Sequence, residues 1–221
     1  MPRISKKEWK RRRRRKRMII RYSILSGFAI IAILILVLIV KLISGLVSGN
    51  DGIIKKAGDV KIEEKLLTVD NNTRSGQELK EVKGIIIHNT AEPGQTADGM
   101  WTYYDKLADS GNVSESMHFI VDEDGSIIQS IPCNEIAFHA MSKNSEAIGI
   151  QYCHASQDGS MSKDAYDSLV ALVVELCEEY DLDASDVKLH YDVTSRPCPE
   201  YYVNNPELWQ DFLSDVKKEL E

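Results

Sequence analysis

An uncharged apolar run from Tyr22 to Val40 argues against a wholly water-soluble protein. Its 19 residues are rich in Ile, Leu, Val and Ala. As an α-helix the run covers about 28 Å, close to the roughly 30 Å hydrocarbon core of a bilayer. Lys41 can extend its ammonium group to the membrane boundary, and Leu42 to Val47 can add a further turn. We therefore expect a single transmembrane helix within residues 22–48. The alternative, a cleaved signal peptide, has a shorter apolar core and a small-residue cleavage motif.

Charge is distributed unevenly on the two sides of this run. Residues 1–21 contain 12 Lys/Arg and one acidic residue, whereas residues 51–221 contain 14 Lys/Arg and 33 Asp/Glu. Basic residues beside a spanning helix stay in the cytoplasm, so we expect a cytoplasmic N-terminal segment and an extracellular C-terminal part. The alternative, a basic nucleic-acid-binding arm, is disfavoured because anionic lipid explains the basic run and the acidic part repels phosphate. The expected partner of this segment is the lipid bilayer of the cell membrane, and no nucleic acid.

The chain beyond the apolar run is expected to hold one folded domain. Residues 49–66 are charged and begin with turn-forming residues, which predicts a linker there and a domain over residues 67–221. Short β-branched runs alternate with amphipathic segments in this domain. The pattern predicts an α/β fold with a mixed central sheet flanked by helices. The expected strands are 83–88, 118–121, 126–128, 147–152 and 187–189, and the expected helices are 96–107, 162–180 and 206–220.

Two histidines stand at the ends of expected strands, where sites gather in α/β sheets. They are His88 and His190, and Cys198 follows eight residues after His190, between two prolines. A loop of that length can return a thiol to the His190 ring. Two His and one Cys leave a tetrahedral zinc ion one open position, as in catalytic zinc sites. The alternative is a pair of structural histidines at strand ends.

The other three cysteines are not clustered and contain no CxxC pair. This excludes a disulfide scaffold and a zinc knuckle. Cys133, Cys153 and Cys177 are read as small apolar side chains, although an extracellular compartment permits a disulfide. The sequence leaves the oligomeric state open.

Five ordered blocks carry a family resemblance. They resemble the zinc-dependent N-acetylmuramoyl-L-alanine amidases, the family of phage lysozyme-type amidases and peptidoglycan recognition proteins. The resemblance covers roughly residues 67–221. The blocks are GIIIHNTA at 84–91, SMHFIVD at 116–122, IAFHA at 136–140, NS with IGI at 144–150, and HYDV with RPCP at 190–199.

The resemblance implies a function and a set of site residues. The implied reaction is hydrolysis of the amide between N-acetylmuramic acid and L-alanine of the peptidoglycan stem peptide. Zinc would activate water and polarise the scissile carbonyl, and Arg196 occupies the place of a Lys that stabilises the oxyanion. The implied zinc ligands are His88, His190 and Cys198. The implied substrate-groove residues are His139, Asn89 and Asn144.

The sequence departs from the family pattern at two positions suited to proton transfer. Met117 stands where some members carry Tyr, and Gln151 stands where many carry a Glu general base. An amide cannot take a proton from water. We therefore expect Gln151 to line the site without acting as a base, with His118 as a substitute base or a structural residue. The alternative function is a peptidoglycan-binding or sensing module that has lost turnover.

Overall fold

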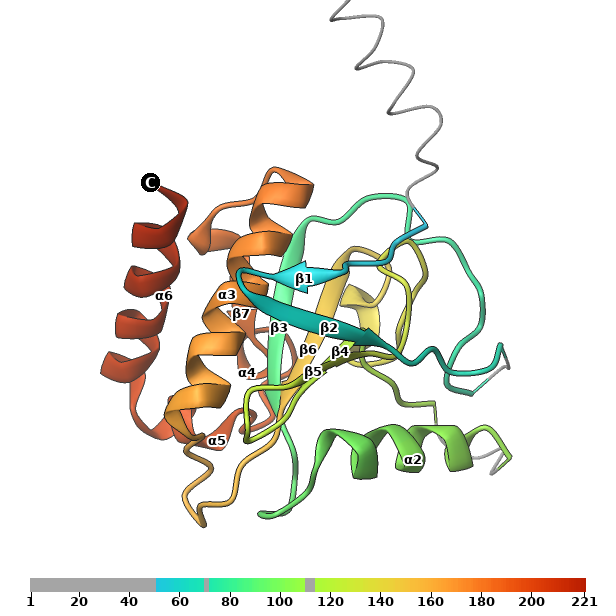
Figure 1. Cartoon of the computed structure of the whole chain (residues 1–221), viewed down its shortest axis with the longest axis horizontal. Coiled ribbons are helices and arrows are strands. Elements are labelled where there is room, and N and C mark those ends of the chain that lie inside the picture. Colours follow the sequence, from blue (N-terminus) through green and yellow to red (C-terminus); the bar gives the residue numbers. More distant parts are fainter. Residues whose placement is uncertain (1–50, 70–71, 110–113) are drawn as a thin grey trace, which may run out of the picture. The chain divides into compact units, whose positions relative to one another are not determined.

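A mixed β-sheet organises the part of the chain that the structure, a computed structural model, describes (Figure 1). Across the sheet the strands run in the order β1-β2-β5-β4-β6-β3-β7. β3 pairs in parallel with β6 and β7, β6 pairs in parallel with β4, and β4 and β5 form an antiparallel hairpin. This confirms the predicted α/β fold with a mixed sheet. The described residues are 51–69, 72–109 and 114–221. The strands are β1 Lys56–Ala57, β2 Val60–Glu64, β3 Gly84–Asn89, β4 Phe119–Val121, β5 Ile127–Gln129, β6 Ala147–Tyr152 and β7 Val187–Leu189.

The interior strand β3 is a continuous run of isoleucines, and it is buried on both faces. Ile85 and Ile87 belong to the larger core cluster, which includes residues of α3 and α6. Ile86 belongs to a different cluster, with Ala140. Since side chains alternate along a strand, His88 shares the face of Ile86. β3 therefore directs His88 away from the face that α3 and α6 cover.

The helices cover the two faces of the sheet unequally. α3 and α6 lie side by side and pack on one face (Figure 1), where Leu169 and Phe212 are fully buried. α2 packs near β4 and β5, with Tyr104 in a second core cluster beside Ile120. The Ser162 side chain caps α3 by accepting from the Ala165 N–H at 3.0 Å, as expected from sequence. The helices are α2 Ala97–Leu107, α3 Lys163–Tyr180, α4 His190–Thr194, α5 Glu200–Asn204 and α6 Pro206–Leu220, with 3-10 turns η1 Met141–Lys143 and η2 Ala184–Asp186.

The linker predicted over residues 49–66 is wrong for its described part. β2 lies within this range and pairs in parallel with β5, with Ile62 opposite Ile127. Ile62 is 3% exposed and Ala57 of β1 is fully buried, so both belong to the core. In β2 the buried Ile62 stands between the exposed Lys61 and Glu63, as in a strand with one face on the core. The folded domain therefore includes the residues from Asp51 onward.

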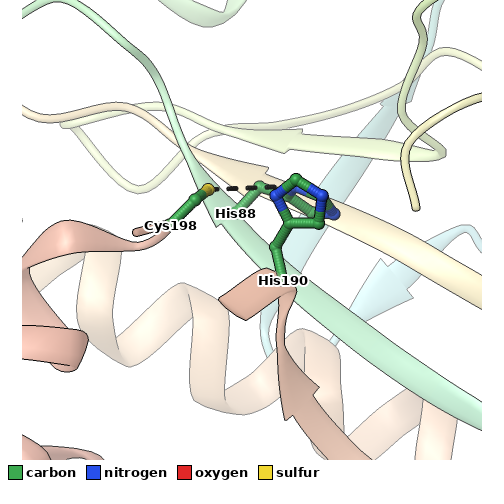
Figure 2. A group of neighbouring side chains, drawn as sticks. All are labelled: His88, His190 and Cys198. Carbon is green, nitrogen blue, oxygen red and sulfur yellow. Dashed lines mark hydrogen bonds between the residues drawn. The ribbon is translucent and has the colours of Figure 1, made fainter. Parts of the chain in front are cut away.

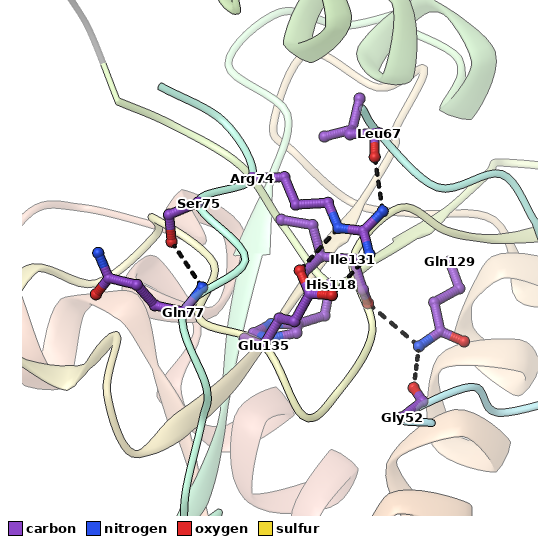
Figure 3. Close-up of polar contacts among 9 residues, drawn as sticks. All are labelled: Gly52, Leu67, Arg74, Ser75, Gln77, His118, Gln129, Ile131 and Glu135. Carbon is purple, nitrogen blue, oxygen red and sulfur yellow. Dashed lines mark hydrogen bonds and ion pairs between the residues drawn. The ribbon is translucent and has the colours of Figure 1, made fainter. Parts of the chain in front are cut away.

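Hydrogen bonds attach this N-terminal segment to the rest of the domain (Figure 3). The Gln129 side chain donates to the Gly52 carbonyl at 2.6 Å and accepts from the Ile54 N–H at 2.9 Å. Arg74 makes a bidentate pair with Glu135, at 2.8 and 2.6 Å, and also donates to a backbone carbonyl. Bidentate Arg–carboxylate pairs are among the stronger polar contacts in proteins. Residues 51–69 and 72–74 are thus part of the folded domain.

The predicted cytoplasmic segment, 1–21, and the predicted transmembrane helix, 22–48, lie outside the described residues. Within the described ranges, no helix has both the length and the apolar character needed to cross a bilayer. The four cysteines all fall in the described ranges and are unpaired. Cys133, Cys153 and Cys177 are buried, in agreement with their interpretation as small apolar side chains.

Candidate active site

Three candidate metal ligands converge at the carboxyl ends of two neighbouring strands. His88 lies near the end of β3, and His190 directly follows β7 as the first residue of α4. The loop after α4 returns Cys198 to the same place, and its carbonyl accepts from the Tyr191 N–H at 2.9 Å. One ligand atom of each residue lies within 4.8 Å of the other two, and Cys198 Sγ is 3.9 Å from His88 Nδ1 (Figure 2). Strand pairing and a short loop thus assemble the predicted triplet.

The chemistry of this donor set fits a zinc ion. Tetrahedral zinc with typical bond lengths separates a nitrogen ligand from a sulfur ligand by about 3.6 Å, close to the separation of His88 Nδ1 and Cys198 Sγ. Burial lowers the pKa of His88 and of His190, so both imidazoles are in the neutral form that binds metals. Burial raises the pKa of the Cys198 thiol to about 11, so an ion bound there must displace the thiol proton.

The triplet lines a cavity of about 950 Å³. Its volume lies at the upper end of the range that ligand pockets occupy. Arg196 is exposed on its wall, close enough for its positive charge to add to the burial that lowers the pKa of His190. The cavity brings together all but one of the other predicted site residues, which are Arg196, Gln151, Asn89, His139 and Asn144.

Gln151 is 4% exposed and lies opposite His88 on β6. Its Oε1 accepts from the Tyr104 hydroxyl at 2.8 Å, and its Nε2 donates to the Asn89 carbonyl at 3.2 Å. Asn89 in turn accepts from the Cys198 thiol through Oδ1, at 3.4 Å. Gln151 therefore lines the site with one amide hydrogen left to donate, and it holds the end of β3 in place.

His139 and Asn144 are joined to each other and to the metal-ligand region. Asn144 Oδ1 accepts from the backbone N–H groups of His139 and Ala140, at 3.0 and 2.6 Å. The His139 ring is 3.2 Å from both His88 Nε2 and the Ala147 carbonyl, so both of its nitrogens are engaged. Burial lowers the pKa of His139 to about 3. Asn144 thus shapes the turn that holds His139. Its side-chain oxygen bonds the backbone of this protein.

His118 is the predicted site residue that the structure leaves outside the cavity. It is fully buried, its Nδ1 accepts from the Gly149 N–H at 2.9 Å, and its Nε2 donates to the Glu135 carbonyl at 2.9 Å. Burial lowers its pKa to about 4. With no free nitrogen and no exposure to the cavity, His118 cannot act as the substitute base. Both ring nitrogens are bonded within the protein, in agreement with the structural interpretation of this residue.

Glu115 is a cavity residue that the sequence analysis did not single out. Glu115 lines the cavity and accepts from the Tyr103 hydroxyl at 3.2 Å. It stands two residues before Met117, which also lines the cavity, at the position where some relatives carry Tyr. An extended segment places residues i and i+2 on the same side, and this spacing is the signal that could have identified Glu115.

Comparison with known proteins finds the same family. The family described as N-acetylmuramoyl-L-alanine amidase matches residues 78–201. The chain is 31% identical over 175 residues to the N-acetylmuramoyl-L-alanine amidase BlyA of Bacillus subtilis, covering 70% of this chain and 46% of that protein. It is also 31% identical to CwlL of Bacillus licheniformis over 171 residues, covering 71% and 47%. The chain thus spans about half the length of the curated relatives it matches.

Solved structures share the fold of the described domain. A mutant endolysin from Bacillus subtilis superposes with a TM-score of 0.60 at 29% identity, covering 71% of this chain and 99% of that chain. The catalytic domain of XlyA gives a TM-score of 0.60 at 26% identity, covering 71% and 99%. The shared part is therefore nearly the whole of those solved domains.

Proposed function

The chain belongs to the N-acetylmuramoyl-L-alanine amidase family, and from this membership we propose that its domain hydrolyses the amide between N-acetylmuramic acid and L-alanine in peptidoglycan. The observation that carries the proposal is the convergence of His88, His190 and Cys198 on the wall of a cavity of about 950 Å³. Two neutral imidazoles and one thiol form a three-ligand set of the type found in catalytic zinc sites.

We propose that these three residues hold zinc. When bound, zinc supplies a Lewis acid that polarises the scissile carbonyl and makes water a nucleophile near neutral pH. In the hydrolysis the water oxygen bonds to the carbonyl carbon, the carbon–nitrogen bond breaks, and the alanine nitrogen leaves with a proton. Arg196, exposed on the cavity wall, can offer its guanidinium to the negative oxygen of the transition state. Gln151 can donate its remaining amide hydrogen to an oxygen in the cavity.

Proton transfer requires a group other than Gln151, and we assign it to Glu115. The carboxylates that line the cavity are those of Glu92, Glu115 and Glu200. The charge of Glu115 adds to the burial that raises the pKa of Cys198, so Glu115 acts within electrostatic range of the ligand set. The Tyr103 hydroxyl donates to Glu115 and orients it. A carboxylate in this place can accept the proton of the attacking water.

A binding module without turnover is the second candidate function. It is favoured by the engagement of Gln151, which carries an amide where many family members carry Glu and whose two ends bond Tyr104 and Asn89. In this case the cavity would hold the muramyl peptide and release it unchanged.

Purified full-length protein in detergent, loaded with zinc and mixed with peptidoglycan, separates the two functions. The amidase proposal expects stem peptides with a newly free L-alanine amino group, and none from the Cys198→Ala variant. Peptidoglycan that is retained without new amino groups supports the binding module. Neither binding nor cleavage would contradict both.

We also propose that this domain is held at the outer face of the cell membrane. The support is the apolar run within residues 22–48 and the 12-to-1 excess of basic over acidic residues in residues 1–21. Peptidoglycan lies on that side of the membrane, so the tether would keep the domain near its substrate.

A further inference from the structure

A row of three polar groups runs from the backbone of β6 to the candidate metal site. The Ala147 carbonyl lies 3.2 Å from His139 Nε2, and His139 Nδ1 lies 3.2 Å from His88 Nε2. His139 is 8% exposed and His88 is 3% exposed, so both contacts are largely shielded from water. The far nitrogen of His88, Nδ1, is the atom that faces Cys198 Sγ at 3.9 Å. The row therefore ends on a candidate metal-binding atom.

The chemistry of the first group fixes every proton in the row. A carbonyl oxygen only accepts, so His139 Nε2 must carry the hydrogen and donate it to Ala147. A neutral imidazole has one N–H, so His139 Nδ1 is an acceptor. The nitrogen facing it, His88 Nε2, must then be the donor. His88 Nδ1 is left with a free lone pair, directed at the place where a metal ion would bind.

The surroundings prevent the His139 ring from leaving this arrangement. Gly149, on β6, lies against the ring: a Cβ there would be only 2.6 Å from His139 Cγ and 2.8 Å from Nδ1. The His118 ring packs nearby in an edge-to-face geometry, with centroids 5.8 Å apart. Asn144 holds the His139 backbone. β6 thus provides both the acceptor, at Ala147, and the space, at Gly149.

We propose that His139 is a positioning residue that sets the tautomer of His88, so that Nδ1 presents its lone pair to the metal ion. This inference rests on the metal site of the proposed function. It gives His139 a role other than the substrate contact that the family resemblance implies, because both ring nitrogens are used within the protein. Partners of this kind, bonded to the far nitrogen of a ligand histidine, commonly change metal affinity by about 10–100-fold when they are replaced.

Three variants of the full-length protein in detergent test the proposal through Co²⁺ titration followed by absorption. His139→Phe keeps a flat buried ring and removes both nitrogens, and it should weaken Co²⁺ binding by about 10–100-fold. His139→Gln offers an oxygen to His88 and an amide hydrogen to Ala147, and it should restore most of the affinity. His154→Phe is the matched control: His154 is likewise buried, at 3% exposed, but it bonds the carbonyls of Ser156 and Thr90. This control should bind Co²⁺ as wild type does.

The tautomer itself can be read without metal or activity, from the ¹⁵N chemical shifts of histidine rings in the metal-free protein. Wild type should carry the His88 proton on Nε2, and His139→Phe should lose that preference. A His88 proton on Nδ1 in wild type, or equal Co²⁺ affinity in wild type and a folded His139→Phe variant, would overturn the proposal. If wild type binds no Co²⁺ at all, the metal site of the proposed function fails. The ¹⁵N shifts still decide whether His139 sets the tautomer of His88.

Discussion

His88 and Gln151 lie directly opposite each other on the parallel strands β3 and β6. This register places the amide of Gln151 beside a candidate metal ligand, where the family resemblance expects a carboxylate. The Gln151 side chain has a structural role instead: it accepts from the Tyr104 hydroxyl and donates to the Asn89 carbonyl. The position therefore stabilises the end of β3 while offering no base.

Replacing that amide by a carboxylate should accelerate hydrolysis. In Gln151→Glu, Tyr104 can still donate to one carboxylate oxygen, and the second oxygen can accept a proton from the attacking water. General-base assistance contributes about 10²–10⁴-fold, so we expect at least about a tenfold gain after the loss of the bond to Asn89. The measurement is the rate of amide cleavage by both forms at equal zinc occupancy.

Gln151→Met is the matched control for this substitution. It keeps the length of the side chain, removes both hydrogen bonds and adds no base, so it should not raise the rate. Equal rates in Gln151→Glu and a fast wild type would show that Glu115 alone already supplies full general-base assistance, and Glu115→Gln should then slow hydrolysis.

Loss of the thiolate ligand should abolish stable metal binding. Cys198→Ala leaves only His88 and His190, and we expect bound zinc to fall from about one per chain to well below that value. Metal analysis after dialysis measures this directly. Cys153→Ala is the control, because Cys153 is buried away from the triplet and should leave the zinc content unchanged. Equal zinc in wild type and Cys198→Ala would place the metal elsewhere.

The buried His118 should make the metal-free domain less stable in mild acid. Its pKa is lowered by burial to about 4 in the folded state, against about 6.5 when unfolded. Between these pH values the unfolded chain binds a proton that the folded chain excludes, so the stability is complete above about pH 6.5 and decreases as the pH falls towards 4. The shift corresponds to a loss of about 3 kcal/mol.

Urea unfolding of wild type and His118→Gln at several pH values between 7 and 4 tests this effect. Gln can still accept from the Gly149 N–H, so the variant should fold, and its free energy of unfolding should depend less steeply on pH. Both forms keep His88 and His139, whose contributions cancel in the difference. Parallel curves for the two forms would show that His118 does not titrate as described.

Strand β2 should be essential to the stability of the domain. Ile62 is 3% exposed in the main core, and Ile62→Ala should lower the free energy of unfolding by about 2–5 kcal/mol through lost burial and a cavity. Lys61→Ala, on the exposed side of the same strand, should change it by less than about 0.5 kcal/mol. Denaturation in urea measures both. Similar small effects for the two variants would return residues 51–66 to the role of a linker.

The proposed tether predicts that protease added outside intact protoplasts removes the domain. Residues 51–221 should be lost from the membrane fraction, while the basic segment stays protected. The expectation follows from the excess of Lys and Arg before the apolar run. Full protection of the domain until the protoplasts are lysed would reverse the proposed orientation.

Sequence reasoning located the elements that carry strong local signals. Ile85 to Ile87 and the Ala147 to Tyr152 run predict buried strands because they are continuous and rich in β-branched residues. The Ser162 cap and the apolar period after it predict α3. β2 was missed because its one buried residue, Ile62, stands among charged residues. Such a segment has the composition of a solvent-exposed linker.

The three candidate metal ligands could be predicted from the sequence, whereas the roles of the histidines around them could not. His88 and His190 stand at strand ends, and Cys198 follows from its spacing to His190 and from the resemblance, so the triplet could be predicted without knowledge of packing. The relation of His139 to His88 depends on a loop returning to β6, and the exclusion of His118 depends on which way a ring faces. Tertiary packing sets both ring orientations, and neither produces a periodic pattern in the sequence.

The order of strands in the sheet has a consequence for biosynthesis. β3, which carries His88, is synthesised before both of its neighbours, β6 and β7. Until those strands emerge, its isoleucines have an unpaired edge on each side, and such edges invite association with other chains. The proposed metal site is completed later still, since Cys198 follows β7. A nascent chain halted before Val187 would therefore expose its first ligand on a strand with an open edge, and chaperone binding is most needed in that interval.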